Sequence, residues 1–337
     1  MIHSIPPLYP YSGYKFNFKK KSLLYLLDSG RSALLLAVNI LKAKYDKLIF
    51  LLPAYTCHSV IDVMEQSMVK YNFVDVDSSL QFDKKDLELM LEFYKDNTIV
   101  LIATSLFGVK LKNYKKMYPT IKVIEDLSHS LISYKYKESD FAFTSFGKGK
   151  MISAWSGGAL SGFNNEIDEY YLKLPHVNNF FFSFILVQMQ KIVSKYFWFL
   201  LEGTRYNPEK KSQHYIEKIV IKRLNKIKSA WIYGSLESFD YSTNKEFILK
   251  YKNEICKEYQ FDLIGLMPYI RFPVKKKIFM SGVSQISSYA ATYYKATKRR
   301  SSSLSGAKLL AEGVSFLPTH NLVKEEYLRE IIQNVNT

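Results

Sequence analysis

The 337-residue sequence has few of the residue types that build disulfides and metal sites. Its two cysteines, Cys57 and Cys256, cannot form a disulfide framework, which is typical of a reducing compartment such as the cytoplasm. Six histidines occur, at positions 3, 58, 129, 176, 214 and 320, and none forms a pair at the short spacing of metal ligands. We therefore expect a cytoplasmic chain without a metal site.

The sequence also lacks internal repeats and low-complexity linkers. Its first residues, MIHSIPPLYPYSGYKF, contain no apolar stretch of the kind found in signal peptides. A hydrophobic content of 47% with 23% charged residues indicates a folded globular chain rather than a disordered one. This length predicts one large domain with a smaller one beside it.

The net charge of +16 raises the question of a polyanionic partner. The basic residues are spread along the chain, and no nucleic-acid-binding motif accompanies them. We therefore expect no nucleic-acid partner. A small anionic substrate or an acidic membrane surface fits the same diffuse charge.

The longest apolar stretch is FFFSFILVQMQKIVSKYFWFLL, residues 180–201. It is long enough to span a bilayer, but Lys191 and Lys195 lie inside it, where charges are costly. Together with Gln188 they recur at helical spacing, which predicts a helix with one polar side. We interpret its apolar side as core or dimer contact, and a peripheral contact with the inner face of the membrane stays open.

Short apolar runs alternate with amphipathic stretches through the first half of the chain. The runs predict strands at 47–55, 70–77, 98–108, 121–130, 140–146 and 157–162, and the amphipathic stretches predict helices at 29–45, 59–69 and 83–94. This rhythm predicts an α/β fold with a mainly parallel central sheet and helices on both faces.

The pattern changes after about residue 165. It is helical to residue 250, then predicts a strand at 268–274 and further helices to the end. We therefore expect an N-terminal arm (1–22), a large α/β domain (23–205) and a smaller C-terminal α+β domain (206–337).

Polar residues follow the predicted strands, where the chemistry of a parallel sheet gathers. The motif SGRS places Gly30, Arg31 and Ser32 at a helix N-terminus, where exposed amides favour phosphate. Asp126 ends an apolar strand, so its charge needs a cation or hydrogen-bond donors, although a helix cap or an ion pair is an alternative. His129 follows in the next turn and can reach the same pocket.

The segment SFGKGKMISAWSGGAL places Lys148 and Lys150 in a glycine-rich turn. A solvated basic turn is the simpler interpretation. However, an anion site, a buried acid and a lysine, in this order along a parallel sheet, suit pyridoxal 5'-phosphate (PLP). That cofactor needs a phosphate site, an acid beside its pyridine nitrogen and a lysine for the Schiff base.

Five segments carry a resemblance to a known family, namely SGRSALLLAV, LPAYTCHSVIDV, FVDVD, VIEDLSHSL and SFGKGKMISAWSGGAL. They resemble the DegT/DnrJ/EryC1/StrS sugar aminotransferases, which are PLP-dependent enzymes of fold type I. The resemblance runs from about residue 23 to residue 335. It implies a homodimer with active sites at the subunit interface.

The resemblance also implies roles for single residues. Lys150, four residues after Phe146 of the Ser-Phe pair, would be the Schiff-base lysine, with Lys148 as the alternative. Asp126 would pair with the pyridine nitrogen, and His129 would lie near the ring oxygen of the cofactor. The phosphate would be held by the Ser145 hydroxyl and by the amides at Arg31 and Ser32, with Gly30 as the small residue of the same SGRS cradle.

The sequence departs from the family pattern at several positions. Cys57 stands where the family has an aromatic residue stacked on the ring, and Tyr55 or His58 would have to replace it. Ile221 stands where the partner subunit's phosphate-binding asparagine is expected, and Ser156 replaces an acidic residue. These departures leave the substrate and the exact reaction open.

The resemblance implies an aminotransferase that moves an amino group, from glutamate, onto a nucleotide-linked keto sugar for polysaccharide or glycoconjugate synthesis. Some relatives that dehydrate keto-deoxysugars carry histidine in place of the lysine, and this chain keeps a lysine. Two alternatives stay open. One is a protein of this fold with a binding or regulatory role, and the other is a membrane-associated PLP enzyme acting on another substrate.

Overall fold

A computed structural model describes most of the chain. The described residues are 24–130, 139–147, 150–152, 154, 156–162, 164–177, 185, 189, 218–237, 242–261, 271–280, 283, 287–300, 303–319 and 325–337. The predicted arm, the apolar stretch 180–201 apart from Ile185 and Met189, and the predicted boundary at 205/206 lie outside them. Within the described residues, no helix has the length and apolarity needed to cross a membrane.

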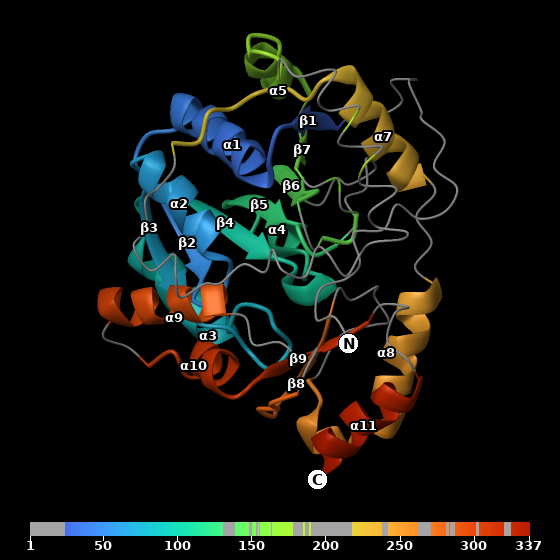
Figure 1. Ribbon diagram of the computed structural model, residues 1–337. Helices are drawn as coiled ribbons and strands as arrows, with labels where there is room; N and C mark the ends of the chain where they lie inside the picture. The colour runs from blue at the N-terminus through green and yellow to red at the C-terminus, as the bar shows by residue number, and fades with distance from the viewer. Residues whose placement is uncertain are drawn as a thin grey trace.

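A seven-stranded sheet forms the centre of the molecule (Figure 1). Its strands are β1 Tyr25–Leu27, β2 Leu48–Pro53, β3 Lys70–Val74, β4 Thr98–Thr104, β5 Lys122–Asp126, β6 Phe141–Ser145 and β7 Gly158–Gly162. The order is β1-β7-β6-β5-β4-β2-β3, with β7 antiparallel to both of its neighbours and all other pairs parallel. The expected mainly parallel sheet is confirmed.

Helices cover both faces of this sheet, as expected. Alternate strand residues point to opposite faces, so Phe50 and Ile102 pack with helices α1 (Gly30–Lys44) and α2 (His58–Gln66). Ile49 and Leu101 pack on the other face with α3 (Lys84–Phe93) and α4 (Tyr114–Met117), and α7 (Lys226–Glu237) covers the β1–β7–β6 end of that face. Because both faces are buried, the strands are apolar throughout rather than alternating.

The C-terminal part adds a two-stranded antiparallel sheet and four helices. They are β8 Arg271–Val274, β9 Ser315–Pro318, α8 Ser242–Glu254, α9 Ser287–Arg299, α10 Ser305–Glu312 and α11 Glu325–Asn336. Helices α8 and α11 lie side by side (Figure 1), where the Asn336 side chain bonds the backbone of Glu254 and Cys256. The remaining described elements are α5 Asn164–Tyr171 and the short 3-10 turns η1 Leu106–Gly108 and η4 Lys257–Tyr259.

Two strands were not expected from the sequence. The strand β1 has three residues and β9 has four, which is too short for a hydrophobic period to stand out. The predicted strand at 98–108 ends earlier, at Thr104, because the chain turns into η1. Phe107 in this turn has the left-handed backbone conformation, with φ 55° and ψ 11°.

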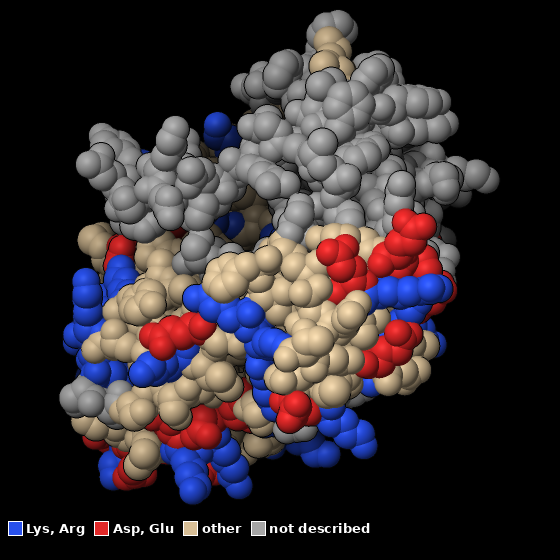
Figure 2. Space-filling model, turned by 60° about the horizontal axis from the view of Figure 1, so that its bottom comes forward, with Lys and Arg blue, Asp and Glu red and all other residues tan. Residues whose placement is uncertain are grey.

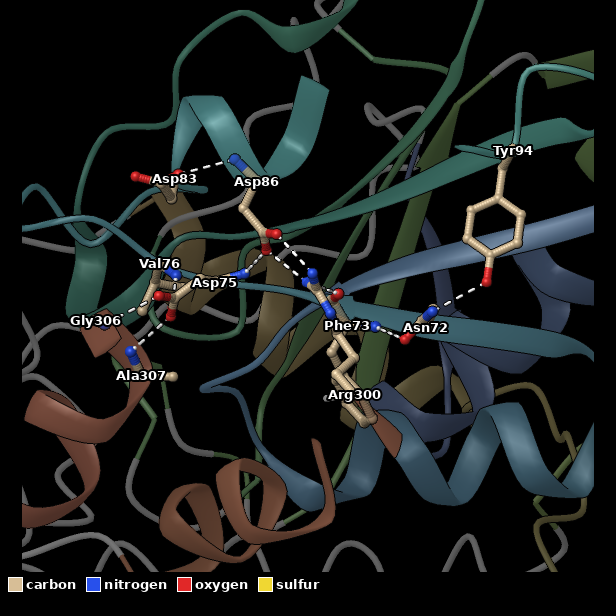
Figure 3. A network of polar contacts seen from close by, with 10 residues as sticks. All are labelled: Asn72, Phe73, Asp75, Val76, Asp83, Asp86, Tyr94, Arg300, Gly306 and Ala307. Carbon is tan, nitrogen blue, oxygen red and sulfur yellow. Dashed lines mark hydrogen bonds and ion pairs between the residues drawn. The ribbon is translucent and has the colours of Figure 1, made fainter. Parts of the chain in front are cut away.

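A carboxylate directly after β3 caps the first turn of α10. The Asp75 carboxylate accepts hydrogen bonds from the amides of Gly306 (3.0 Å) and Ala307 (2.8 Å), as Figure 3 shows. These are first-turn amides, which have no partner inside the helix. A methyl group at Gly306 would lie 1.6 Å from the Val76 carbonyl oxygen, so only glycine allows this approach.

A bidentate ion pair strengthens the same junction (Figure 3). The Arg300 guanidinium donates to both oxygens of Asp86 at 2.6 and 2.7 Å, and to the Phe73 carbonyl at 2.8 Å. Both side chains of the pair are largely buried. Helices α9 and α10 are therefore fixed to the outer strand of the large sheet.

The molecular face in Figure 2 carries both signs of charge. Over the described residues of this view, Lys and Arg side chains are interspersed with Asp and Glu. The positive charges of this face therefore form no continuous basic stripe of the kind that follows a nucleic-acid backbone.

We predict that Arg300→Met destabilises the fold by about 3 kcal/mol, because it leaves the Asp86 carboxylate buried without its cation. Urea denaturation measures this as a lower midpoint. Asp86→Asn should lower the free energy of unfolding much less in the Arg300→Met background than in the parent, since the ion pair is already broken there. Lys298→Met, at an exposed position in the last turn of α9, is the control and should stay within about 0.5 kcal/mol of the parent. An equally small change for Arg300→Met would contradict the assignment.

Candidate active site

One cavity of about 200 Å³ lies at the carboxyl ends of the parallel strands. Seven of the eight predicted site residues line it, namely Gly30, Arg31, Cys57, Asp126, His129, Ser145 and Lys150. They come from α1, the start of α2, the end of β5 and the segment around β6. The structure therefore brings together residues that lie up to 120 positions apart in the sequence.

The start of α1 lies directly against β6 and β7. A methyl group at Gly30 would be 2.8 Å from Ser145 Cβ, and one at Gly158 would be 2.4 Å from the Ser29 carbonyl oxygen. Glycine at both positions thus lets the helix N-terminus approach the strands closely. Ser29, Gly30 and Arg31 line the cavity, so the positive end of the helix dipole lies at its edge.

The hydrogen bonds at the start of α1 determine which of its amides can bind an anion. The Ser32 amide donates to Ser29 Oγ at 3.1 Å, and Ser32 is fully buried outside the cavity wall. Ser32 is therefore the one predicted site residue that does not line the cavity, and its role in the phosphate site stays a prediction. The first-turn amides of Gly30 and Arg31 have no partner four residues back. Ser145 Oγ accepts from the Gly147 amide (3.2 Å), which leaves its own O–H to donate.

Asp126 ends β5 as predicted and is 4% exposed. Its Oδ1 accepts a hydrogen bond from the Ser128 amide at 2.9 Å. Burial raises the pKa of this carboxyl, while the hydrogen bonds from Ser128 and the charge of Lys150 oppose the rise. A cationic N–H group in the cavity would give this carboxylate a charged partner.

Lys150 reaches the same cavity from the glycine-rich turn. Burial lowers the pKa of its amine, and the positive charge of Arg271 adds to this, whereas Cys57 and Asp126 act in the opposite direction. A lowered pKa favours the unprotonated amine, which is the form that a lysine nucleophile requires. The alternative, Lys148, lies outside the described residues.

His129 lines the cavity, but both of its ring nitrogens have protein partners. Nδ1 accepts from the Phe107 amide at 3.1 Å, and Nε2 lies 2.9 Å from the hydroxyl of Tyr289. Burial, together with the charges of Lys150 and Arg271, lowers the pKa of His129 well below its usual value. The ring is therefore neutral and carries its proton on Nε2, from which it donates to Tyr289.

Cys57 lines the cavity where the family pattern has an aromatic residue. Its sulfur accepts a hydrogen bond from Ser59 Oγ at 3.1 Å. Neither proposed substitute lines the cavity. Tyr55 is buried behind the wall, edge-on to Tyr289 at 5.5 Å, and His58 faces Asp62 at 3.6 Å.

The two other departures lie outside the cavity wall. Ile221 is partly buried against the main core. The backbone of the next residue, Lys222, accepts a hydrogen bond from the Asp28 amide and donates one to the Asp28 carboxylate. Ser156 accepts a hydrogen bond from the amine of Lys228, which comes from α7. The β7 turn is thus tied to α7 rather than to an acidic side chain.

Sequence reasoning missed Tyr289, Thr104 and Ser128 in the cavity wall. Tyr289 comes from α9, more than 130 residues after Lys150. It stands in the stretch SSYAATYYK, in a chain with 26 tyrosines. No local signal sets it apart, so only the tertiary structure identifies it.

We predict that Gly158→Ala weakens binding of inorganic phosphate at least tenfold, because the added methyl group pushes the start of α1 away from β7. Isothermal titration calorimetry measures the affinity. Gly313→Ala, at the end of α10 and outside the cavity wall, controls for the general cost of adding a methyl group. Unchanged phosphate affinity in the Gly158 variant would show that the anion binds elsewhere.

No protein-family model and no curated protein matches the sequence. Solved structures match over nearly the whole chain. A DegT DnrJ EryC1 StrS aminotransferase from Brucella abortus shares 15% identity over 93% of this chain and 84% of its own, with a TM-score of 0.66. GDP-4-keto-6-deoxymannose-3-dehydratase (ColD), in a mutant with bound GDP-perosamine, shares 15% over 93% and 88%, with a TM-score of 0.67.

A third structure, Spr1654 from Streptococcus pneumoniae in its PMP form, shares 15% identity over 98% of this chain and 96% of its own, with a TM-score of 0.66. The TM-scores of all three structures show that they share the overall fold of this chain. The chain therefore has the fold of the DegT/DnrJ/EryC1/StrS sugar aminotransferases, the PLP-dependent fold type I.

Proposed function

We propose that the chain is a PLP-dependent aminotransferase that transfers an amino group to a keto sugar. One observation carries the proposal: a single cavity joins the start of α1, the Asp126 carboxylate and the Lys150 amine. These three groups are what the phosphate, the ring nitrogen and the aldehyde of PLP require. All three lie at the carboxyl edge of a parallel sheet, where ligands of such folds bind.

The residues of the cavity fit the cofactor in size and in chemistry. A cavity of about 150 Å³ holds a benzene molecule, so the volume of about 200 Å³ admits a substituted ring. The amides of Gly30 and Arg31 and the hydroxyl of Ser145 are donors for a phosphate dianion. Arg31 is among the lining residues, and we propose that its guanidinium adds a cation.

When bound, PLP would withdraw electrons from the substrate carbon through its ring. Asp126 would hold a proton on the ring nitrogen, and its own burial makes an N–H partner favourable. Lys150 would attach the cofactor and then carry a proton between Nζ and the substrate carbon. Its lowered pKa suits that general acid–base role, which contributes about 10²–10⁴-fold in enzymes.

We propose glutamate as the amino donor and a nucleotide-linked keto sugar as the acceptor, in polysaccharide or glycoconjugate synthesis. The net charge of +16 and Arg31 in the wall favour an anionic substrate. ColD, with the same fold, binds GDP-perosamine. Lys150 favours amino transfer over the dehydration that histidine-bearing relatives perform.

We further propose a cytoplasmic homodimer with the domain division given above. This part rests on the family resemblance and on the small number of cysteines. Analytical ultracentrifugation distinguishes a dimer from a monomer.

A second candidate function is a protein of this fold that binds a ligand without amino transfer. Cys57 favours it, because a thiol replaces the expected ring-stacking aromatic residue in the wall. A purified chain that stays colourless after PLP is added would support this candidate.

We predict that the parent protein with PLP absorbs at about 420 nm and that Lys150→Ala abolishes this band, because no other described amine lines the cavity. Lys148→Ala is the matched control and should keep the band. Adding glutamate to the parent should move the absorbance to about 330 nm, as the amino group passes to the cofactor. A band that survives in Lys150→Ala and disappears in Lys148→Ala would transfer the role to Lys148.

We also predict that Asp126→Asn keeps the covalent link to Lys150 but lowers the rate of amino transfer on the order of 100-fold or more, because a neutral amide no longer stabilises a protonated ring nitrogen. Single-turnover absorbance changes after mixing with glutamate measure this rate. A rate within a few fold of the parent would remove Asp126 from the reaction.

A further inference from the structure

The phenol of Tyr289 is a cavity group without a role in the proposed function so far. It enters the wall from α9, in the C-terminal part of the chain, and is 5% exposed. Helix α9 is held against the large sheet by the Arg300–Asp86 ion pair at its C-terminal end. The position of Tyr289 is therefore set by packing and not by a loop.

The hydrogen bonds of His129 determine what the Tyr289 hydroxyl can do. The Phe107 amide is a fixed donor, so Nδ1 of His129 accepts (3.1 Å) and the neutral ring has its proton on Nε2. That proton is donated to Tyr289 Oη at 2.9 Å. Tyr289 thus accepts one hydrogen bond and keeps its own O–H proton. Within the described residues, no acceptor takes this proton.

Ring packing holds the three groups in this arrangement. The rings of His129 and Tyr289 are stacked with centroids 5.8 Å apart and 9° between their planes, and Phe107 stacks on His129 at 5.7 Å. Phe107 has a positive φ of 55°, an unfavourable conformation for a large side chain, which is typical of functional sites. This conformation belongs to the turn whose amide bonds His129. Burial also raises the pKa of Tyr289, so the phenol keeps its proton at neutral pH.

The remaining polar group of the cofactor is an oxygen on its ring. In the proposed function, the phosphate, the ring nitrogen and the aldehyde already have partners at the α1 start, Asp126 and Lys150. We propose that Tyr289 Oη donates a hydrogen bond to the ring oxygen, and that His129 is a positioning residue acting through Tyr289. This replaces the direct contact of His129 that the family resemblance implies, because both nitrogens of His129 are occupied. The inference rests on the proposed function.

The test uses the full-length chain stripped of cofactor and titrated with PLP, with binding followed by absorbance. Tyr289→Phe removes only the hydroxyl and keeps the ring stack. We expect it to weaken PLP binding about 10- to 100-fold, the effect of losing a hydrogen bond to a charged oxygen. Tyr293→Phe is the matched control, since it lies one turn further along α9, is buried and does not line the cavity. It should bind PLP within about twofold of the parent.

A double-mutant cycle separates Tyr289 from His129. If His129 acts through Tyr289, then His129→Phe weakens PLP binding in the parent but by less than about threefold in the Tyr289→Phe background. Additive effects would mean that His129 contacts the cofactor independently, which overturns the inference. The thermal midpoint of each cofactor-free variant is measured alongside, and if His129→Phe does not fold, Tyr289→Phe alone decides.

Two failures are distinguishable. A parent chain that does not bind PLP removes the proposed function, and this inference with it. A parent chain that binds PLP, together with a Tyr289→Phe variant that binds equally well, overturns the inference alone.

Discussion

The burial of one carboxylate and one amine in the same cavity is the constraint on which the site depends. Burial is the largest influence on the pKa of both groups, raising that of Asp126 and lowering that of Lys150. Each side chain is thereby pushed towards its neutral form, and each only partly compensates the other. A ligand that brings a cationic N–H to Asp126 and an electrophilic carbon to Lys150 relieves both costs. This is why the site suits a pyridine ring with an aldehyde.

Close backbone packing between α1 and the sheet gives the cavity its shape. Gly30 and Gly158 allow the start of α1 to approach β6 and β7, which places anion-binding amides at one edge of the cavity. At the other sheet edge, Asp75 and the Arg300–Asp86 pair hold α9 and α10. The cavity is therefore lined by elements far apart in the chain, including α9 through Tyr289.

Sequence reasoning recovered the features that have a local physical cause. Strands buried on both faces are apolar throughout, so the parallel sheet was predictable, and Lys150 is marked by its glycine-rich turn. The hydrogen bond by which the Ser32 amide closes the helix cap could not be identified from the motif alone. The short strands β1 and β9 have too few residues for a period, and Tyr289 depends on a contact with His129 across 160 positions.

The central claim is a covalent bond between PLP and the Lys150 amine. Incubation of the full-length chain with PLP, reduction with borohydride and peptide mass mapping tests it most directly, because reduction makes the link permanent. The account predicts one added pyridoxyl phosphate group per chain, located on Lys150. Its absence, or its location on Lys148 or on surface lysines in proportion to their exposure, would contradict the account.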